Sequence, residues 1–373
     1  MTQASLLKSH ETPPLPEGSD YYVPAVFDRK GEREAIANLS AADWEKIVPL
    51  IHFLGPREPG AKLSSERFTQ WSRRVAEAVG QHAFYLDLPR LSPSTTVKTG
   101  KGDVLILDRL YEAMRKRKCR FIPVANIGKR FEAALNSVTN CALSDGNGFA
   151  LRYRFRELAP RPNEDHVSRL SSALERIDLD AGSADLIVDL SYIDPDDEFD
   201  VDLLAVDLQS MLDVADWRSV VLLGSSMPPM MSCVKEGTVG EIDRREWDLW
   251  REIRKKKLSR PLVFGDYTIQ CPTPPSKGGP SMRRTVRYTA STATVVARGM
   301  GDITESDNSQ YKELCGTIRG RPEFCGEAYS WGDETIAKCA AGRLRPRAQE
   351  MWRGAGTSHH IKFVKDQLQG VPR

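Results

Sequence analysis

Hydrophobic residues in this chain gather in eight short runs rich in β-branched and aromatic side chains. Such runs, bounded by polar residues, are typical of buried β-strands. Three of the runs contain a proline in their interior (Pro24, Pro49 or Pro123), which would remove a hydrogen bond from its strand. The runs lie at 21–27, 47–53, 83–88, 121–127, 149–155, 185–191, 219–225 and 261–267.

The segments between these runs carry hydrophobic residues at helical spacing. Phe68, Trp71, Val75 and Val79, for example, fall on one face of a helix. Such a face packs against a sheet while the opposite face meets water. The same period recurs within 104–114, 131–142, 167–177, 204–212 and 242–253.

Strand and helix patterns alternate with a nearly constant repeat. Seven steps cover 240 residues between Tyr21 and Pro261, or about 34 residues per unit, which fits a right-handed βαβ crossover. Eight units in succession predict an α/β fold, a closed (β/α)8 TIM-like barrel. An open, doubly wound sheet is the alternative. It would leave two edge strands, which are usually shorter and more polar than these runs.

The pattern changes at both ends of this repeat. Residues 1–19 are polar and proline-rich, which indicates a flexible arm. We assign 20–270 to the barrel. Residues 271–373 contain a β-ribbon pattern at 285–299 and further helical segments, too many residues for one closing helix. We therefore expect a C-terminal α+β extension packed on the barrel.

Alternation along the strands assigns the polar residues to the two faces of the barrel. Leu186, Val188 and Leu190 share one parity and would face the helices, so Asp189 would face inward. Active sites of this architecture lie at the carboxyl ends of the strands. The catalytic candidates there are His52, Asp87, Asp189 and Asp266, although the parity of Asp266 is ambiguous, and the ligand-binding candidates are Arg152 and Arg154.

These groups fit more than one role. Arg154 between carboxylates would make a closed ion-pair network without chemistry, because buried charges persist when paired. Alternatively, the aspartates would act as general acid and base or hold a hard divalent cation, although nothing specifies a metal or any other cofactor. Further candidates for an anionic ligand are Ser225 and Ser226 after the seventh strand, Lys30 after the first, and His359.

Composition excludes several classes of protein. The net charge is +2, from 53 basic and 51 acidic residues, whereas nucleic-acid binders usually carry excess positive charge. No apolar run reaches the length of a membrane span, and no secretory signal is evident. The seven cysteines form no CxxC pair, so reduced thiols in the cytoplasm are expected.

Several phrases, in order along the chain, resemble the beta-protein family, named for a product of a satellite phage. They are "YVPAVFDRKGEREAIANLSAADWEKIVPLI", "WRSVVLLGSSMP", "REWDLW", "FGDY", "VRYT", "QYKELC", "WGDETIAKCAAG" and "TSHHIKFV". The resemblance runs from about Tyr21 to near the C-terminus. It implies a protective protein of a prophage module, encoded beside a host-killing partner that it antagonises, and it carries no established catalytic residues.

Two functional hypotheses follow. In the first, the protein is an interaction protein that restrains a genetically neighbouring toxic effector in an anti-phage module. In the second, it is a barrel enzyme, a hydrolase or lyase that acts on a phosphorylated or otherwise anionic small ligand, with or without a metal. The barrel favours the second only by analogy, because one fold hosts many functions.

Overall fold

The computed structural model confirms the closed barrel. It describes residues 19–54, 65–89, 95–100, 102–128, 131–156, 165–177, 179–273, 283–301, 308–346 and 348–371. Eight parallel strands close in the order β1-β11-β9-β8-β7-β6-β3-β2, and β1 pairs with both β11 and β2. Of the arm predicted at 1–19, all but Ser19 lies outside the described residues.

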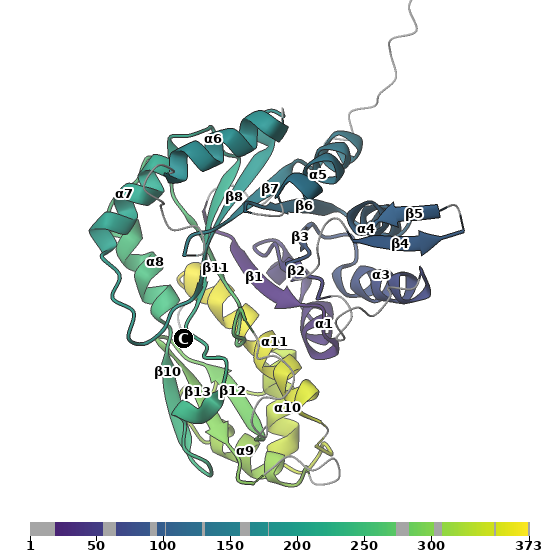
Figure 1. Ribbon diagram of the computed structural model, residues 1–373. Helices are drawn as coiled ribbons and strands as arrows, with labels where there is room; N and C mark the ends of the chain where they lie inside the picture. The colour runs from purple at the N-terminus through teal and green to yellow at the C-terminus, as the bar shows by residue number, and fades with distance from the viewer. Residues whose placement is uncertain are drawn as a thin grey trace, which may run out of the picture.

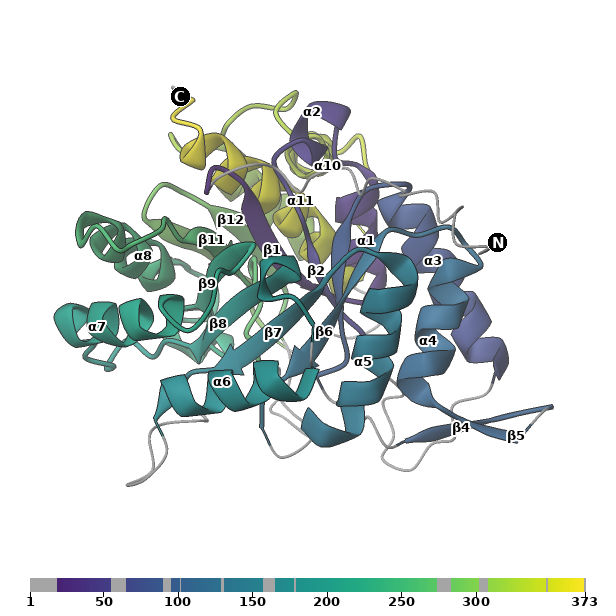
Figure 2. The ribbon, with the colours of Figure 1, turned by 90° about the horizontal axis from the view of Figure 1, so that it is seen from above.

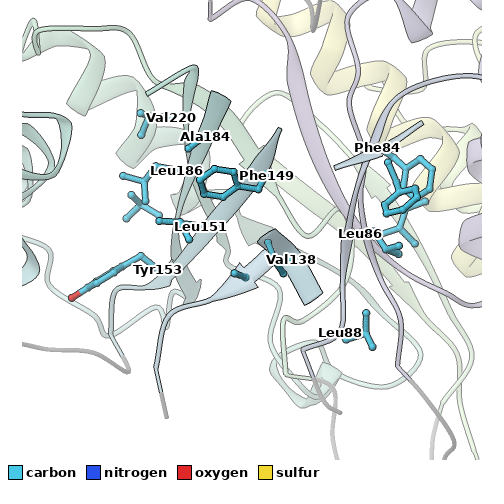
Figure 3. Close-up of a cluster of buried hydrophobic side chains, with 14 of the residues drawn as sticks. Phe84, Leu86, Leu88, Val138, Phe149, Leu151, Tyr153, Ala184, Leu186 and Val220 are labelled. Atoms are coloured by element: carbon cyan, nitrogen blue, oxygen red, sulfur yellow. The ribbon is translucent and has the colours of Figure 1, made fainter. Parts of the chain in front are cut away.

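Each barrel strand lies within or close to one of the eight hydrophobic runs. The strands are β1 (Tyr22–Phe27), β2 (Leu50–His52), β3 (Phe84–Asp87), β6 (Phe121–Asn126), β7 (Phe149–Arg154), β8 (Ala184–Tyr192), β9 (Ser219–Ser225) and β11 (Val263–Asp266). The predicted parity also holds, because Leu186, Val188 and Leu190 pack in the outer hydrophobic layer and Ile187 packs in the lumen. Figure 3 shows part of this outer layer, including Leu151, Tyr153 and Leu186.

Helices cover the outside of the barrel (Figures 1 and 2). Their hydrophobic stripes face the strands, as the spacing predicts; Phe68 and Val75 are fully buried in this way. The helices are α1 (Lys30–Ala37), α2 (Ala41–Trp44), α3 (Ser65–Val79), α4 (Ile106–Arg115), α5 (Phe131–Asp145), α6 (His166–Ile177), α7 (Val201–Leu212) and α8 (Arg245–Lys255). A short hairpin of β4 (Thr96–Thr99) and β5 (Gly102–Leu105) precedes α4.

A small antiparallel sheet with two helices forms the extension. Its strand order is β10-β13-β12, with β10 (Val239–Asp243), β12 (Thr285–Thr289) and β13 (Ala293–Arg298). Helices α9 (Gln310–Arg319) and α10 (Trp331–Ala340) pack on it. The extension is therefore not one continuous segment, because β10 comes from the 20–270 stretch assigned to the barrel.

The last helix, α11 (Gln349–Leu368), belongs to the barrel ring as well as to the extension. It lies between the barrel and the sheet β10-β13-β12 (Figure 1). It packs along α1 and against β1, and Arg244 at the start of α8 donates to Gln367. Thus α11 occupies the place of the eighth barrel helix.

Small residues allow α11 to pack on all sides. A Cβ atom on Gly332 of α10 would lie 2.0 Å from the carbonyl oxygen of Ala355, and one on Gly31 of α1 would lie 2.2 Å from that of Glu350. A Cβ on Gly356 would lie 2.8 Å from the carbonyl oxygen of Arg287 in β12. The backbones of α10, α1 and β12 are therefore in direct contact with the backbone of α11.

Candidate functional site: the carboxyl end of the barrel

Arg152 is the centre of a buried polar cluster inside the barrel. Its Nε and Nη2 atoms donate to one Asp189 carboxylate oxygen at 3.1 and 2.7 Å, and its Nη1 atom donates to Asp87. The Nε2 atom of His52 lies 3.4 Å from the Arg152 guanidinium and 3.6 Å from the Asp87 carboxylate. Arg152, rather than Arg154, is thus the arginine that joins the two aspartates.

Tyr267, which follows β11, completes this set. Its hydroxyl accepts from Arg152 at 2.5 Å and donates to Asp189 at 2.8 Å. We call His52, Asp87, Arg152, Asp189 and Tyr267 the Arg152 cluster. None of the five is more than 3% exposed, so every charge in it depends on the others.

The remaining oxygens of the two aspartates are bonded too. Asn126 at the end of β6 donates to Asp87 at 2.6 Å, and the backbone N–H of Ser191 donates to Asp189 at 2.9 Å. The carboxylates and Tyr267 keep the pKa of Arg152 well above its usual range although burial acts to lower it. Burial raises the pKa of Tyr267 well above its usual range, so this hydroxyl keeps its proton and donates.

A second polar layer closes the opposite end of the lumen. Asp185, at the start of β8, is fully buried and accepts from Arg218 at 2.9 and 2.5 Å, from Ser219 at 2.9 Å and from Tyr85 at 3.0 Å. Between the two layers the lumen is apolar, with Ile187 and Val221 among its residues. The lumen of the barrel is therefore a packed core, and active sites of this architecture lie at the carboxyl ends of the strands.

Backbone strain occurs at this end. Ser191 and Thr268 adopt positive φ angles of 59° and 56°, a region that favours glycine. Each lies two residues after an aspartate: Ser191 follows Asp189 within β8, and Thr268 follows Asp266, the last residue of β11. Strand β8 also leaves its register with β9 between Asp189 and Tyr192. Non-glycine residues in such conformations cluster at functional sites.

The prediction that Asp266 lies at the mouth with the other aspartates is wrong. Asp266 shares its parity with the outward-facing Phe264, and it contacts α11 instead of the lumen. The hydroxyl of Tyr22 donates to it, and the Nε2 atom of His360 lies 2.9 Å from its carboxylate. Asp266 therefore bonds across the contact between the barrel and α11, because this helix from the far end of the sequence covers β11.

The other ligand candidates contact residues outside the cluster. Ser225 donates to the carbonyl oxygen of Gln270 at 3.1 Å, and Ser226 donates to the buried Glu246 at 2.6 Å. The Lys30 side chain is 64% exposed and lies 3.8 Å from Glu34.

His359 and His360 lie on helix α11, not on a strand. His359 is 3.0 Å from Asp333 and 2.9 Å from the carbonyl oxygen of Thr289, inside the extension. Arg154 is half-buried at the end of β7, close enough to Tyr267 to act on it electrostatically. Of the predicted site residues, the structure therefore gathers His52, Asp87, Arg152 and Asp189, with Arg154 beside them.

Comparison with protein-family models matches the family described as Beta protein over residues 22–366. The chain belongs to the Beta protein family. No curated protein matches. Among solved structures, this family member is similar to the apo crystal structure of 3-keto-D-glucoside 4-epimerase, YcjR, from E. coli. The sequence identity is 12% and the TM-score is 0.32, and the match covers 68% of this chain and 94% of that chain.

Two further features bear on this family member. Within the described ranges, no group of three or more histidine, cysteine, aspartate or glutamate side chains is arranged to hold a metal ion. Among the same residues, no helix has both the length and the apolar character needed to cross a membrane. The Arg152 cluster, held together by an arginine side chain and not by a metal ion, remains the site that the geometry supports.

Proposed function

We propose that this Beta protein family member binds a small polar ligand at the carboxyl end of its barrel, with the Arg152 cluster as the floor of the site. The observation that carries the proposal is the cluster itself: five polar side chains from four strands and one loop, held in fixed positions at the end of the barrel where ligands bind. Donors and acceptors that are positioned in advance select a ligand by its hydrogen-bonding pattern.

Binding is favoured over catalysis by the way these groups are paired. Asp87 and Asp189 both face the Arg152 guanidinium, which leaves neither carboxylate poised as a base. A catalytic role is the alternative that His52 favours, because its ring lies between Asp87 and Tyr267 and imidazole transfers protons near neutral pH. Turnover of a bound ligand, lost on changing His52 to Gln while binding persists, would establish that alternative.

A thermal-shift screen with sugar phosphates, nucleotides and carboxylic acids tests the proposal. A ligand of this site should give a saturable shift that Asp189→Asn abolishes, because the amide changes the acceptor pattern of the floor. The matched control is Asp216→Asn, whose carboxylate is 91% exposed and pairs with Arg260. Equal ligand shifts in wild type and Asp189→Asn would contradict the proposal.

Family membership favours a second candidate function, antagonism of a host-killing partner encoded nearby. The match over residues 22–366 supports it, since it covers the barrel and the extension together. Co-expression with proteins encoded beside the gene is the test. Rescue of growth together with co-purification supports antagonism, whereas neither result with any neighbour would argue against it.

A further inference from the structure

We infer that an anion-binding site lies where the extension meets the barrel, formed by Arg287 of β12 and Arg353 of α11 beside Arg29 at the start of α1. Its ligand is a phosphoryl or carboxylate group of a small molecule. The inference rests on the proposed function, because it names the chemistry of one part of the ligand that binds at this end of the barrel.

Backbone contacts bring the three arginines to one place. A Cβ atom added to Gly354 would lie 2.7 Å from the carbonyl oxygen of Gly31, so the backbones of α11 and α1 are in contact there. The neighbouring Arg353 therefore lies beside the first turn of α1. That turn follows the carboxyl end of β1, with Arg29 as its N-cap. Arg287 lies against Gly356, one turn further along α11, and its guanidinium reaches the loop after β11, where it donates to Ile269 at 2.5 Å.

Neither Arg287 nor Arg353 makes an ion pair in the part of the chain that the structure describes, although Arg353 is close enough to the buried Glu32 to act on its carboxylate electrostatically. Arg353 makes no hydrogen bond or ion pair there, although it is half-buried. Arg287 makes one bond, to the Ile269 carbonyl, and its Nε atom is buried without an acceptor. A buried donor without an acceptor is costly, and an unpaired charge costs more.

The charges around the junction compensate the repulsion between the arginines only in part. Burial, followed by the charges of Arg353 and Arg29, lowers the pKa of Arg287 to about 10. Two carboxylates are nearby, Glu350 and Glu32. Glu350 accepts from the Lys30 backbone N–H at 3.0 Å, and burial raises the pKa of Glu32, although the charges of Arg29 and Arg353 act to lower it.

An anion would relieve all of these penalties at once. Guanidinium groups bind phosphate and carboxylate through two parallel hydrogen bonds, and charge-assisted bonds of this kind are about twice as strong as neutral ones. Because the three arginines come from β12, α11 and the start of α1, a bound anion would also tie the extension to the barrel. The anionic group would lie at the edge of the mouth, and the rest of the ligand would reach toward the Arg152 cluster.

The test is direct binding to the full chain at constant ionic strength, with inorganic phosphate, pyrophosphate and acetate as separate probes. We expect saturable binding of at least one probe, measured by calorimetry or by phosphorus NMR line broadening. Arg353→Gln should weaken it at least about tenfold, whereas Arg353→Lys should keep part of it, because lysine preserves the charge without the planar fork. The matched control Arg251→Gln, at a half-exposed pair with Asp248 on α8, should leave binding unchanged.

Two results would overturn the inference: no saturable binding of any probe, or equal binding in wild type and Arg353→Gln. Arg287→Gln gives a second, independent variant with the same expectation. Tight binding of the phosphates but not acetate identifies a phosphoryl group, and the reverse identifies a carboxylate. Failure of this site alone leaves the Asp189-dependent binding of a larger ligand intact, so the two proposals fail separately.

Discussion

Replacing Arg152 with methionine should leave the carboxylates of Asp87 and Asp189 buried in the lumen without their ion-pair partner. Methionine fills a similar length but offers no donor to Asp87 or Asp189, which are at most 1% exposed. Removing one partner of a buried ion pair costs about 3–5 kcal/mol. With an unfolding entropy of about 2.1 cal/mol/K per residue, the 373 residues give about 0.8 kcal/mol/K, so the melting temperature should fall by about 4–6 °C.

A double-mutant cycle isolates the cause of this loss. In the wild-type background, Asp189→Asn should destabilise the fold because it weakens the bonds from Arg152 and Tyr267. In the Arg152→Met background the same change should stabilise it, because it removes one unpaired charge. Differential scanning calorimetry or urea unfolding of the four proteins measures both effects.

A surface pair provides the control. Arg176 and Glu132 form an ion pair at 2.5 Å in which both side chains are about half exposed. Arg176→Met should cost less than about 1 kcal/mol, since exposed pairs are screened by water. A loss from Arg152→Met no larger than this, or the same sign for Asp189→Asn in both backgrounds, would refute the reasoning.

Two other predictions concern α11. Gly332→Ala should destabilise the fold by about 2–3 kcal/mol in urea unfolding, because its new methyl group would overlap the carbonyl oxygen of Ala355. The control Gly316→Ala, in α9, places its methyl group in open space and should be neutral or stabilising. Similar losses of stability at both sites would contradict the packing argument. His360 has its pKa lowered from 6.5 by burial, despite the nearby Asp266. The folded state therefore binds fewer protons at His360 than the unfolded state, and this contribution to stability is lost as pH falls below about 6.5. His360→Gln should flatten the fall in the free energy of unfolding between about pH 7.5 and 5.5. An unchanged slope would contradict this role of His360.

Local pattern was enough to predict the barrel. The barrel strands and the helices between them have hydrophobic periods set by one partner, the sheet or the helix layer, and such periods are visible in a single sequence. The same alternation placed His52, Asp87 and Asp189 inside. The same parity places Asp185 inside, two residues before Ile187, but at the amino end of its strand, where this architecture does not lead one to expect a site.

The features that the sequence did not reveal depend on contacts between distant segments. Helix α11 packs on α1, α10 and β12 at once, so it has no polar face and shows no helical period. The outward direction of Asp266 follows from this helix, as do the positions of Arg287 and Arg353. Arg152 was recognised as inward, but its role needed the distance to Tyr267, which follows a strand more than a hundred residues later.

The position of α11 sets an order on biosynthesis. Residues 267–348 leave the ribosome after the eighth barrel strand and before the helix that covers the seam between β1 and β11. During that interval the nascent chain exposes the apolar outer side of this seam, including Tyr22 and Phe264. The seam between the first and last strands is consequently covered late, by a helix synthesised a whole subdomain after the eighth strand.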